Sequence, residues 1–185
     1  MSTLERETGE TKIRLSVTVA EDGSGEADVT VDDRFLGHMV ETLARYAGLR
    51  IEVDAEGDLQ HHLIEDVAIT LGLALRDEIP ERATRYGWAT VPMDEALVDA
   101  AIDLGGRAWY EGRLPSTLYE HFLQSFATNL GATLHVDVRR GRDRHHIVEA
   151  AIKATGLALR QGLAAGSGEG VFSTKGSILL RRPEE

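Results

Sequence analysis

The strongest constraint on the fold is a pentapeptide that occurs twice in the chain. His61-His62-Leu63-Ile64-Glu65 returns as His145-His146-Ile147-Val148-Glu149, 84 positions later. The agreement continues downstream, where Gly72-Leu73-Ala74-Leu75 recurs at the same offset as Gly156-Leu157-Ala158-Leu159. The chain therefore consists of two copies of one unit, and its fold must place the two histidine pairs at equivalent positions.

A lone histidine precedes each pair, at His38 in the first copy and at His121 in the second, 83 positions apart. Six of the seven histidines in the chain therefore fall on repeated positions. Histidines that only cap helices or face solvent have no reason to keep such a pattern, so it indicates metal binding. The seventh, His135, lies in a predicted strand with alternating apolar and polar residues. We expect it to have a structural role or to contact a metal ligand without binding the metal itself.

Helix geometry predicts that the two histidines of each pair bind different metal ions. If each pentapeptide opens a helix, adjacent residues point about 100° apart, so one ion can hardly take both rings of a pair. The two histidines of a pair therefore serve two different ions, and each ion draws on both copies. The spacing does not fix how the ligands divide between the ions.

Six histidines and two glutamates give four protein ligands for each of two ions. This mixed imidazole and carboxylate set suits manganese, iron or zinc and leaves positions open for a substrate. The chain has no cysteine, which excludes thiolate zinc and iron–sulfur sites. The predicted metal ligands are His38, His61, His62, Glu65, His121, His145, His146 and Glu149.

Composition limits the class of protein. At 185 residues, with 42% hydrophobic and 28% charged residues, the chain fits one globular domain or two small halves packed as one. It shows no apolar run long enough for a membrane helix and no signal peptide, so we expect a soluble, cytoplasmic protein. The net charge of −11 disfavours nucleic acid as a partner.

Periodicity predicts the same order of elements in each copy: strands, a helix, a strand and a second helix. In the first copy, residues 27–31 are expected to pair back onto residues 13–19 as a hairpin, before a helix over 35–46 and a strand over 49–53. In the second copy, helices are expected over 117–130 and from the second histidine pair to about residue 163, with a last strand over 177–180.

The resulting fold class is α+β. We expect antiparallel-leaning sheets with helices on one face of each sheet, a two-layer sandwich, with half-repeats at residues 1–84 and 85–185 inside one compact domain.

Short motifs over nearly the whole chain resemble those of one family. They are Glu10-Thr11, His38-Met39, His61-His62-x-x-Glu65-Asp66, Pro92-Met93-Asp94-Glu95-Ala96, Gly106-Arg107, His121-Phe122, His145-His146-x-x-Glu149 with Lys153, and Ser173-Thr174-Lys175-Gly176. Taken together, they are similar to those of the imidazoleglycerol-phosphate dehydratase family of histidine biosynthesis.

The resemblance implies a tandem repeat of a ribosomal protein S5 domain 2-like unit. It implies a metal-dependent hydro-lyase that converts imidazole glycerol phosphate, a small phosphorylated molecule, to imidazole acetol phosphate and water. It also implies two Mn²⁺ per subunit, in sites shared between subunits of a homo-oligomer of 24 chains. Neither nucleic acid nor membrane is an expected partner.

The resemblance also implies roles for further residues. Glu10 is expected to act as the acid and base that handles the carbon-bound proton, and Asp94 and Glu95, near the substrate, are the weaker catalytic candidates. The cations and hydroxyls that match the family's phosphate and substrate contacts are Arg85, Arg107, Lys153, Ser173 and Lys175.

The chain also departs from the family pattern. Gly37 replaces an aspartate beside His38, Thr42 replaces a glutamine, Tyr46 stands where a histidine is common, and the turn that ends at Gln60 is short. None of these changes removes a ligand, but they alter the surroundings that tune bound metals.

Two other functions remain open from the residues alone. A dinuclear metallohydrolase also uses histidine and carboxylate ligands, but it has no need for the cationic set or the Ser-Thr-Lys-Gly motif. A metal-assembled S5-like module with a structural or RNA-binding role is the non-enzymatic alternative, and the acidic balance argues against RNA.

Overall fold

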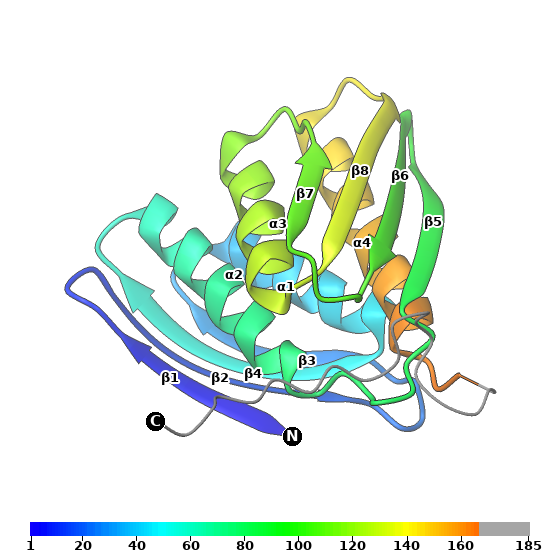
Figure 1. Ribbon diagram of the computed structural model, residues 1–185. Helices are drawn as coiled ribbons and strands as arrows, with labels where there is room; N and C mark the ends of the chain where they lie inside the picture. Colours follow the sequence, from blue (N-terminus) through cyan, green and yellow to red (C-terminus); the bar gives the residue numbers. More distant parts are fainter. Residues whose placement is uncertain (167–185) are drawn as a thin grey trace, which may run out of the picture.

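The computed structural model describes residues 1–166, which form two four-stranded sheets and four helices (Figure 1). The first unit contains β1 (Ser2–Glu7), β2 (Thr11–Val19), β3 (Glu26–Val31), α1 (Arg34–Ala47), β4 (Leu49–Gly57) and α2 (Gln60–Arg76). The second contains β5 (Tyr86–Met93), β6 (Ala96–Asp103), β7 (Trp109–Gly112), α3 (Thr117–Leu130), β8 (Thr133–Arg140) and α4 (Arg144–Leu163).

The two units share one sheet topology. The strand orders are β1-β2-β4-β3 and β5-β6-β8-β7, with two antiparallel pairings followed by one parallel pairing in each sheet. The register also repeats, because Arg6 pairs with Ile13 in the first hairpin and Val91 with Val98 in the second. The sequence repeat is therefore a repeat of topology.

The predicted hairpin between residues 13–19 and 27–31 is wrong. β2 is flanked by β4 on one side and by β1, a strand that the sequence analysis did not predict, on the other. β3 instead pairs in parallel with β4, because α1 crosses between these two strands and returns the chain in the same direction. The helices over 117–130 and to residue 163 are confirmed.

Each sheet carries helices on one face. α1 and α2 contact the first sheet, α4 and α3 contact the second, and the helices of the two units pack against each other as the pairs α2–α3 and α1–α4. All four helices thus lie between the two sheets (Figure 1). The α+β class and its tandem two-unit architecture are confirmed, and each sheet is mixed, with two antiparallel pairings and one parallel pairing. The boundary at residues 84 and 85 stays a prediction.

The repeated glycines allow the helices to approach closely. A Cβ on Gly72 would lie 2.6 Å from the carbonyl oxygen of Phe126 on α3, and a Cβ on Gly156 would lie 2.8 Å from the Cβ of Tyr46 on α1. Any larger side chain would push the helix pairs apart. Close packing of α2 on α3 and of α1 on α4 brings the amino-terminal ends of partnered helices together, and these ends carry the repeated histidines.

Candidate metal centre

One cluster of donor atoms lies between α1 and α4. His38 Nε2 is 3.3 Å and His145 Nε2 is 3.0 Å from Oε2 of Glu149. The three donor atoms all lie within 4.8 Å of one another, which is close enough for a single ion. Glu149 is buried and the two histidines are about half exposed, so the carboxylate lies on the protein side of the cluster and the rings lie on the solvent side.

A second cluster lies between α2 and α3. His61 Nε2 is 3.2 Å from Oε2 of Glu65, and the ring of His121 is 5.3 Å from that of His61, centroid to centroid. An open cavity of about 460 Å³ adjoins these three residues. Each cluster therefore combines side chains from both units, and it does so at the amino-terminal ends of two helices.

The second histidine of each pair points away from its cluster. The rings of His61 and His62 are 6.1 Å apart and nearly perpendicular, and so are those of His145 and His146. The Nδ1 atom of His62 is 2.7 Å from Oδ1 of Asp58, and that of His146 is 2.8 Å from Oε2 of Glu95. These carboxylates raise the pKa of both rings and fix their orientation.

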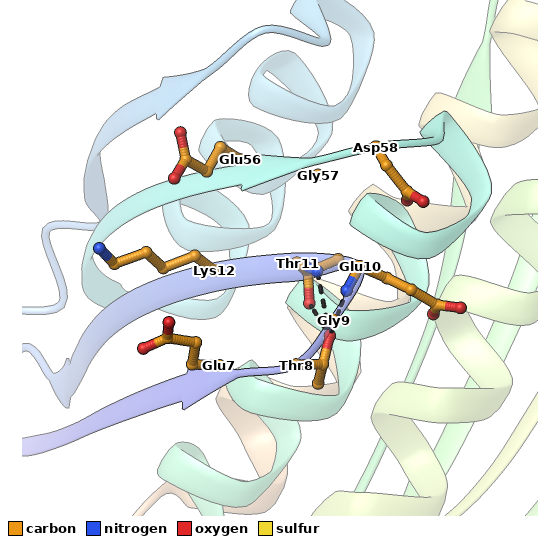
Figure 2. Close-up of a pocket in the computed structure, with 9 residues that line it drawn as sticks. All are labelled: Glu7, Thr8, Gly9, Glu10, Thr11, Lys12, Glu56, Gly57 and Asp58. Atoms are coloured by element: carbon orange, nitrogen blue, oxygen red, sulfur yellow. Dashed lines mark hydrogen bonds between the residues drawn. The ribbon is translucent and has the colours of Figure 1, made fainter.

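The two hairpin turns place carboxylates beside these outer histidines in different ways. Glu95 accepts hydrogen bonds from the backbone N–H groups of Asp143 and Arg142 as well as contacting His146, and together these lower its pKa to about 2. Glu10, over half exposed, approaches His62 Nδ1 at 3.6 Å. Figure 2 shows it extending from the β1–β2 turn, which lines an open hollow of about 470 Å³ with the end of β4.

Lys153 lies beside one cluster. Its Nζ atom is 2.9 Å from Oε1 of Glu149 and 5.6 Å from the ring centroid of Tyr46. Burial alone would raise the pKa of Glu149, but hydrogen bonds from Lys153 and His38 lower it. Burial likewise opposes the charge of Lys153, whose pKa is nevertheless raised by Glu149. The lysine therefore holds the inner oxygen of the carboxylate while Oε2 faces the histidines.

The predicted phosphate-binding arginines lie at the opposite end of the second unit. Arg85 pairs with Asp103 at 3.0 Å, and its backbone N–H donates to the carbonyl of Gly162. Gly162 follows His145 by 17 residues on α4, which corresponds to about 25 Å along the helix. Arg107 lies in the β6–β7 loop, where its carbonyl accepts from Thr133.

The structure thus does not bring these arginines to the histidine clusters of the same chain. Asp94 is exposed, 3.5 Å from His146 Nε2. Ser173 and Lys175 lie outside the described residues.

The donor set fits a divalent transition metal. Imidazole nitrogens and carboxylate oxygens are ligands that manganese, iron and zinc accept. In His62 and His146, a carboxylate contacts Nδ1, so Nε2 is the ring nitrogen that could bind a metal; in His146 it also lies 3.5 Å from Oδ2 of Asp94. Three donors per cluster leave room for further ligands, and the outer histidines have the right chemistry to supply them from another copy of the chain.

Two carboxylates near the site were not assigned by the sequence analysis. Asp58, which contacts His62, had been given no role, although it lies four residues before that histidine. Asp66, which contacts Thr11, appeared only as part of a motif. The spacing of four was a usable signal for Asp58, but no local spacing joins Asp66 to a residue 55 positions earlier.

The fold and the site together define a class. They describe a two-unit α+β protein in which imidazole–carboxylate clusters with the chemistry of metal ligands form where helices from the two halves meet. Among the described residues, no helix is long and apolar enough to cross a membrane.

Residues 31–159 match the model of the imidazoleglycerol-phosphate dehydratase family, and the chain belongs to that family, whose members are hydro-lyases of histidine biosynthesis. An imidazoleglycerol-phosphate dehydratase of Geobacter sulfurreducens is 42% identical, over 96% of this chain and 98% of the relative.

Solved structures agree with this assignment. A crystal structure of the Pyrococcus furiosus enzyme has a TM-score of 0.82 and 37% identity, covering 95% of this chain and all of that one. The Staphylococcus aureus enzyme has a TM-score of 0.80 and 28% identity, covering 89% and 99% of the two chains.

Proposed function

We propose that this chain is a metal-dependent imidazoleglycerol-phosphate dehydratase, which converts imidazole glycerol phosphate to imidazole acetol phosphate and water. The observation that carries the proposal is the pair of imidazole–carboxylate clusters at the helix ends, with the exposed carboxylate of Glu10 beside an outer histidine. Membership of the family supports the substrate and the reaction.

The two clusters provide the metal ligands in this proposal. His38, His145 and Glu149 would hold one Mn²⁺, and His61, His121 and Glu65 the other. His62 and His146 would complete the sites of neighbouring copies, which makes the working form a homo-oligomer, in our proposal of 24 chains with metal sites between subunits. Bound ions would act as Lewis acids toward the imidazole ring and hold it in place.

The remaining chemistry falls to the chain's own side chains. Dehydration removes a hydroxyl from the carbon attached to the ring and a proton from the next carbon, and the enol that results becomes the ketone. In this proposal Glu10 takes that proton, which is supported by its exposed carboxylate 3.6 Å from Nδ1 of His62. Asp94 is exposed near His146 and is the second candidate for proton transfer.

The substrate phosphate requires cations and hydroxyl groups. Lys153 lies next to the α1–α4 cluster of its own chain, whereas Arg85 is about 25 Å away along α4. We therefore propose that Arg85 and Arg107 bind substrate held by the metal sites of a neighbouring copy. Ser173 and Lys175 complete the proposed phosphate contacts.

The test is a product assay. The purified protein is stripped of metal with a chelator, reloaded with Mn²⁺ and incubated with imidazole glycerol phosphate. The ketone product and free inorganic phosphate are then both measured. Metal-dependent ketone without phosphate release supports the dehydratase. Phosphate release without ketone would favour the metallohydrolase instead, and neither product from a protein that retains Mn²⁺ would favour a structural module.

A further inference from the structure

A buried carboxylate ties the first hairpin to the helix that carries His61 and His62. Asp66 on α2 is only 8% exposed and Thr11 at the start of β2 only 4%. The Thr11 hydroxyl donates to Oδ2 of Asp66 at 2.5 Å, and Arg6 on β1 donates to Oδ1 at 3.0 Å. Both carboxylate oxygens of Asp66 are therefore engaged by the hairpin.

The hydrogen bonds continue from Asp66 to the backbone of Glu10. The hydroxyls of Thr11 and Thr8 are 3.1 Å apart, and the Thr8 hydroxyl accepts from the N–H groups of Glu10 and Thr11 (Figure 2). On the other side, the carbonyl of Glu10 accepts from the N–H of Asp58 at 2.9 Å. The backbone of Glu10 is held at both ends, while its carboxylate accepts no hydrogen bond from the described residues.

The second unit has apolar side chains at the three equivalent positions. The hairpin registers superpose at an offset of 85, so Ala96 stands where Thr11 does and Val91 where Arg6 does. At the helix offset of 84, Ala150 stands where Asp66 does. These three residues are buried. The second unit therefore packs its hairpin on its helix without a buried carboxylate at this position, although Glu95 and Gln161 make polar contacts elsewhere between the hairpin and α4 or the loop before it.

The polar version in the first unit calls for another explanation. Burying a carboxylate and a hydroxyl is unfavourable unless they are hydrogen-bonded, so the apolar set is the simpler way to obtain stability alone. What the polar set adds is direction, because hydrogen bonds fix angles that apolar contacts leave free. The residue whose position this chain of bonds determines is Glu10.

We propose that Asp66 is a positioning residue for the reaction, acting through Thr11 and Thr8 to fix the turn that presents Glu10 to the substrate. The inference rests on the proposed function, since it matters only if Glu10 transfers a proton. Proton transfer depends steeply on distance, and a displacement near 1 Å can reduce a rate by about a hundredfold.

The main test introduces two of the second unit's three apolar residues into the first unit and leaves Arg6 in place. The double variant Asp66→Ala/Thr11→Ala is loaded with Mn²⁺, and its metal content, KM and kcat are measured. We expect normal metal content, a KM within about threefold of the wild type and a kcat lower by about a hundredfold. Hydrogen exchange at the backbone amides of Glu10 and Thr11 should become faster, because their acceptor is no longer held.

A double-mutant cycle separates positioning from general damage. In a Glu10→Gln background, the Asp66→Ala/Thr11→Ala change should lower kcat little further, because no carboxylate remains to be positioned. An equal hundredfold fall in that background would overturn the proposal, and so would a wild-type kcat in the double variant itself.

Two single substitutions keep the test decisive if the double variant fails to fold. Thr11→Ser keeps the hydroxyl and should preserve kcat, whereas Thr11→Val removes it and should lower kcat; equal values would overturn the proposal. Thr18→Val is the matched control, because it removes another hydroxyl–carboxylate bond from β2, that to Glu78, and kcat should not change.

Failure of the proposed function would look different. The wild-type protein itself would then make no ketone, and the amide-exchange measurement would still report whether Asp66 holds the turn.

Discussion

The two imidazole–carboxylate clusters have the same composition but different surroundings. Glu149 of the α1–α4 cluster is 9% exposed and paired with Lys153, whereas Glu65 of the α2–α3 cluster is 42% exposed. Four residues after Glu65, at the position equivalent to Lys153, the chain has Ile69, which borders an open cavity. Duplication thus preserved the ligands while the groups behind them diverged, so the two sites are electrostatically unequal.

The hairpin turns differ in the same sense, with the fixed carboxylate in the second unit and the exposed one in the first. In the second unit, Glu95 is fixed by two backbone N–H groups and a histidine, so it serves as a permanent anion. In the first unit, the backbone of Glu10 is fixed and its carboxylate is exposed. A group that exchanges protons must be able to change charge, so the comparison favours the proposal that Glu10 carries the chemistry and that Glu95 supports His146.

The largest expected effect separates these two glutamates. Glu10→Gln should lower kcat by about a thousandfold, because it removes the proposed acid and base. Glu95→Gln should leave kcat at saturating Mn²⁺ within a few-fold of the wild type but weaken metal binding by about ten- to a hundredfold. Steady-state kinetics across a Mn²⁺ titration measures both, and equal loss of kcat in the two variants would contradict the assignment.

The clusters themselves should lose metal one at a time. His145→Ala and His61→Ala each remove one donor from a different cluster, so each variant should retain about half of the wild-type Mn²⁺ after dialysis, as measured by elemental analysis. His135→Ala, outside both clusters, is the control and should keep the full amount. If either cluster variant lost all its metal while folded, the two ions would have to share their ligands more closely than the clusters suggest.

Sequence reasoning succeeded where the information was local or repeated. The 3.6-residue periodicity predicted the helices over 117–130 and to residue 163, and the repeat predicted that both units have one topology. It failed for the pairing partner of the strand at residues 27–31. Which strands pair depends on the neighbours available in the fold, and β1, which occupies the edge beside β2, had not been predicted.

The candidate site shows the same limit. The six repeated histidines and the Glu10 turn were identified from spacing and resemblance. The tie from Asp66 to Thr11 joins residues 55 positions apart, and the fixed state of Glu95 depends on two N–H groups from the loop before α4. Contacts of this kind follow from tertiary structure and leave no periodic trace in the sequence.

A moderate effect on folding stability is expected from replacing Lys153, the cation that pairs with Glu149 of the α1–α4 cluster. Lys153→Met should destabilise the metal-free protein by about 1–3 kcal/mol, because it leaves the largely buried Glu149 without its charged partner. The matched variant Ile69→Lys places a lysine behind the exposed Glu65 and should change stability by less than about 1 kcal/mol. Urea unfolding in the presence of a chelator measures both, and similar effects in the two would show that the clusters are electrostatically equivalent.

The smallest expected effect is a pH dependence of folding stability that comes from Glu95 in the second hairpin and its partner His146. Hydrogen bonds from Asp143, His146 and Arg142 lower the pKa of Glu95 from 4.5 to about 2 in the folded protein. The ionised carboxylate therefore stabilises the fold fully above about pH 4.5, and this stabilisation is lost as the pH falls toward 2. The pKa of its partner His146 is raised above 6.5, so that contribution is complete below about pH 6.5 and is lost as the pH rises through the raised value.

The pair should therefore stabilise the metal-free protein most between about pH 4.5 and 6.5. The difference in urea midpoint between the wild type and Glu95→Gln should peak in that window and shrink on both sides. The same measurement on Glu10→Gln should show a smaller difference, because the carboxylate of Glu10 is exposed and 3.6 Å from its histidine. An equal peak for Glu10→Gln would mean that the first turn also holds a fixed anion, and Glu10 would then be a poor candidate for proton transfer.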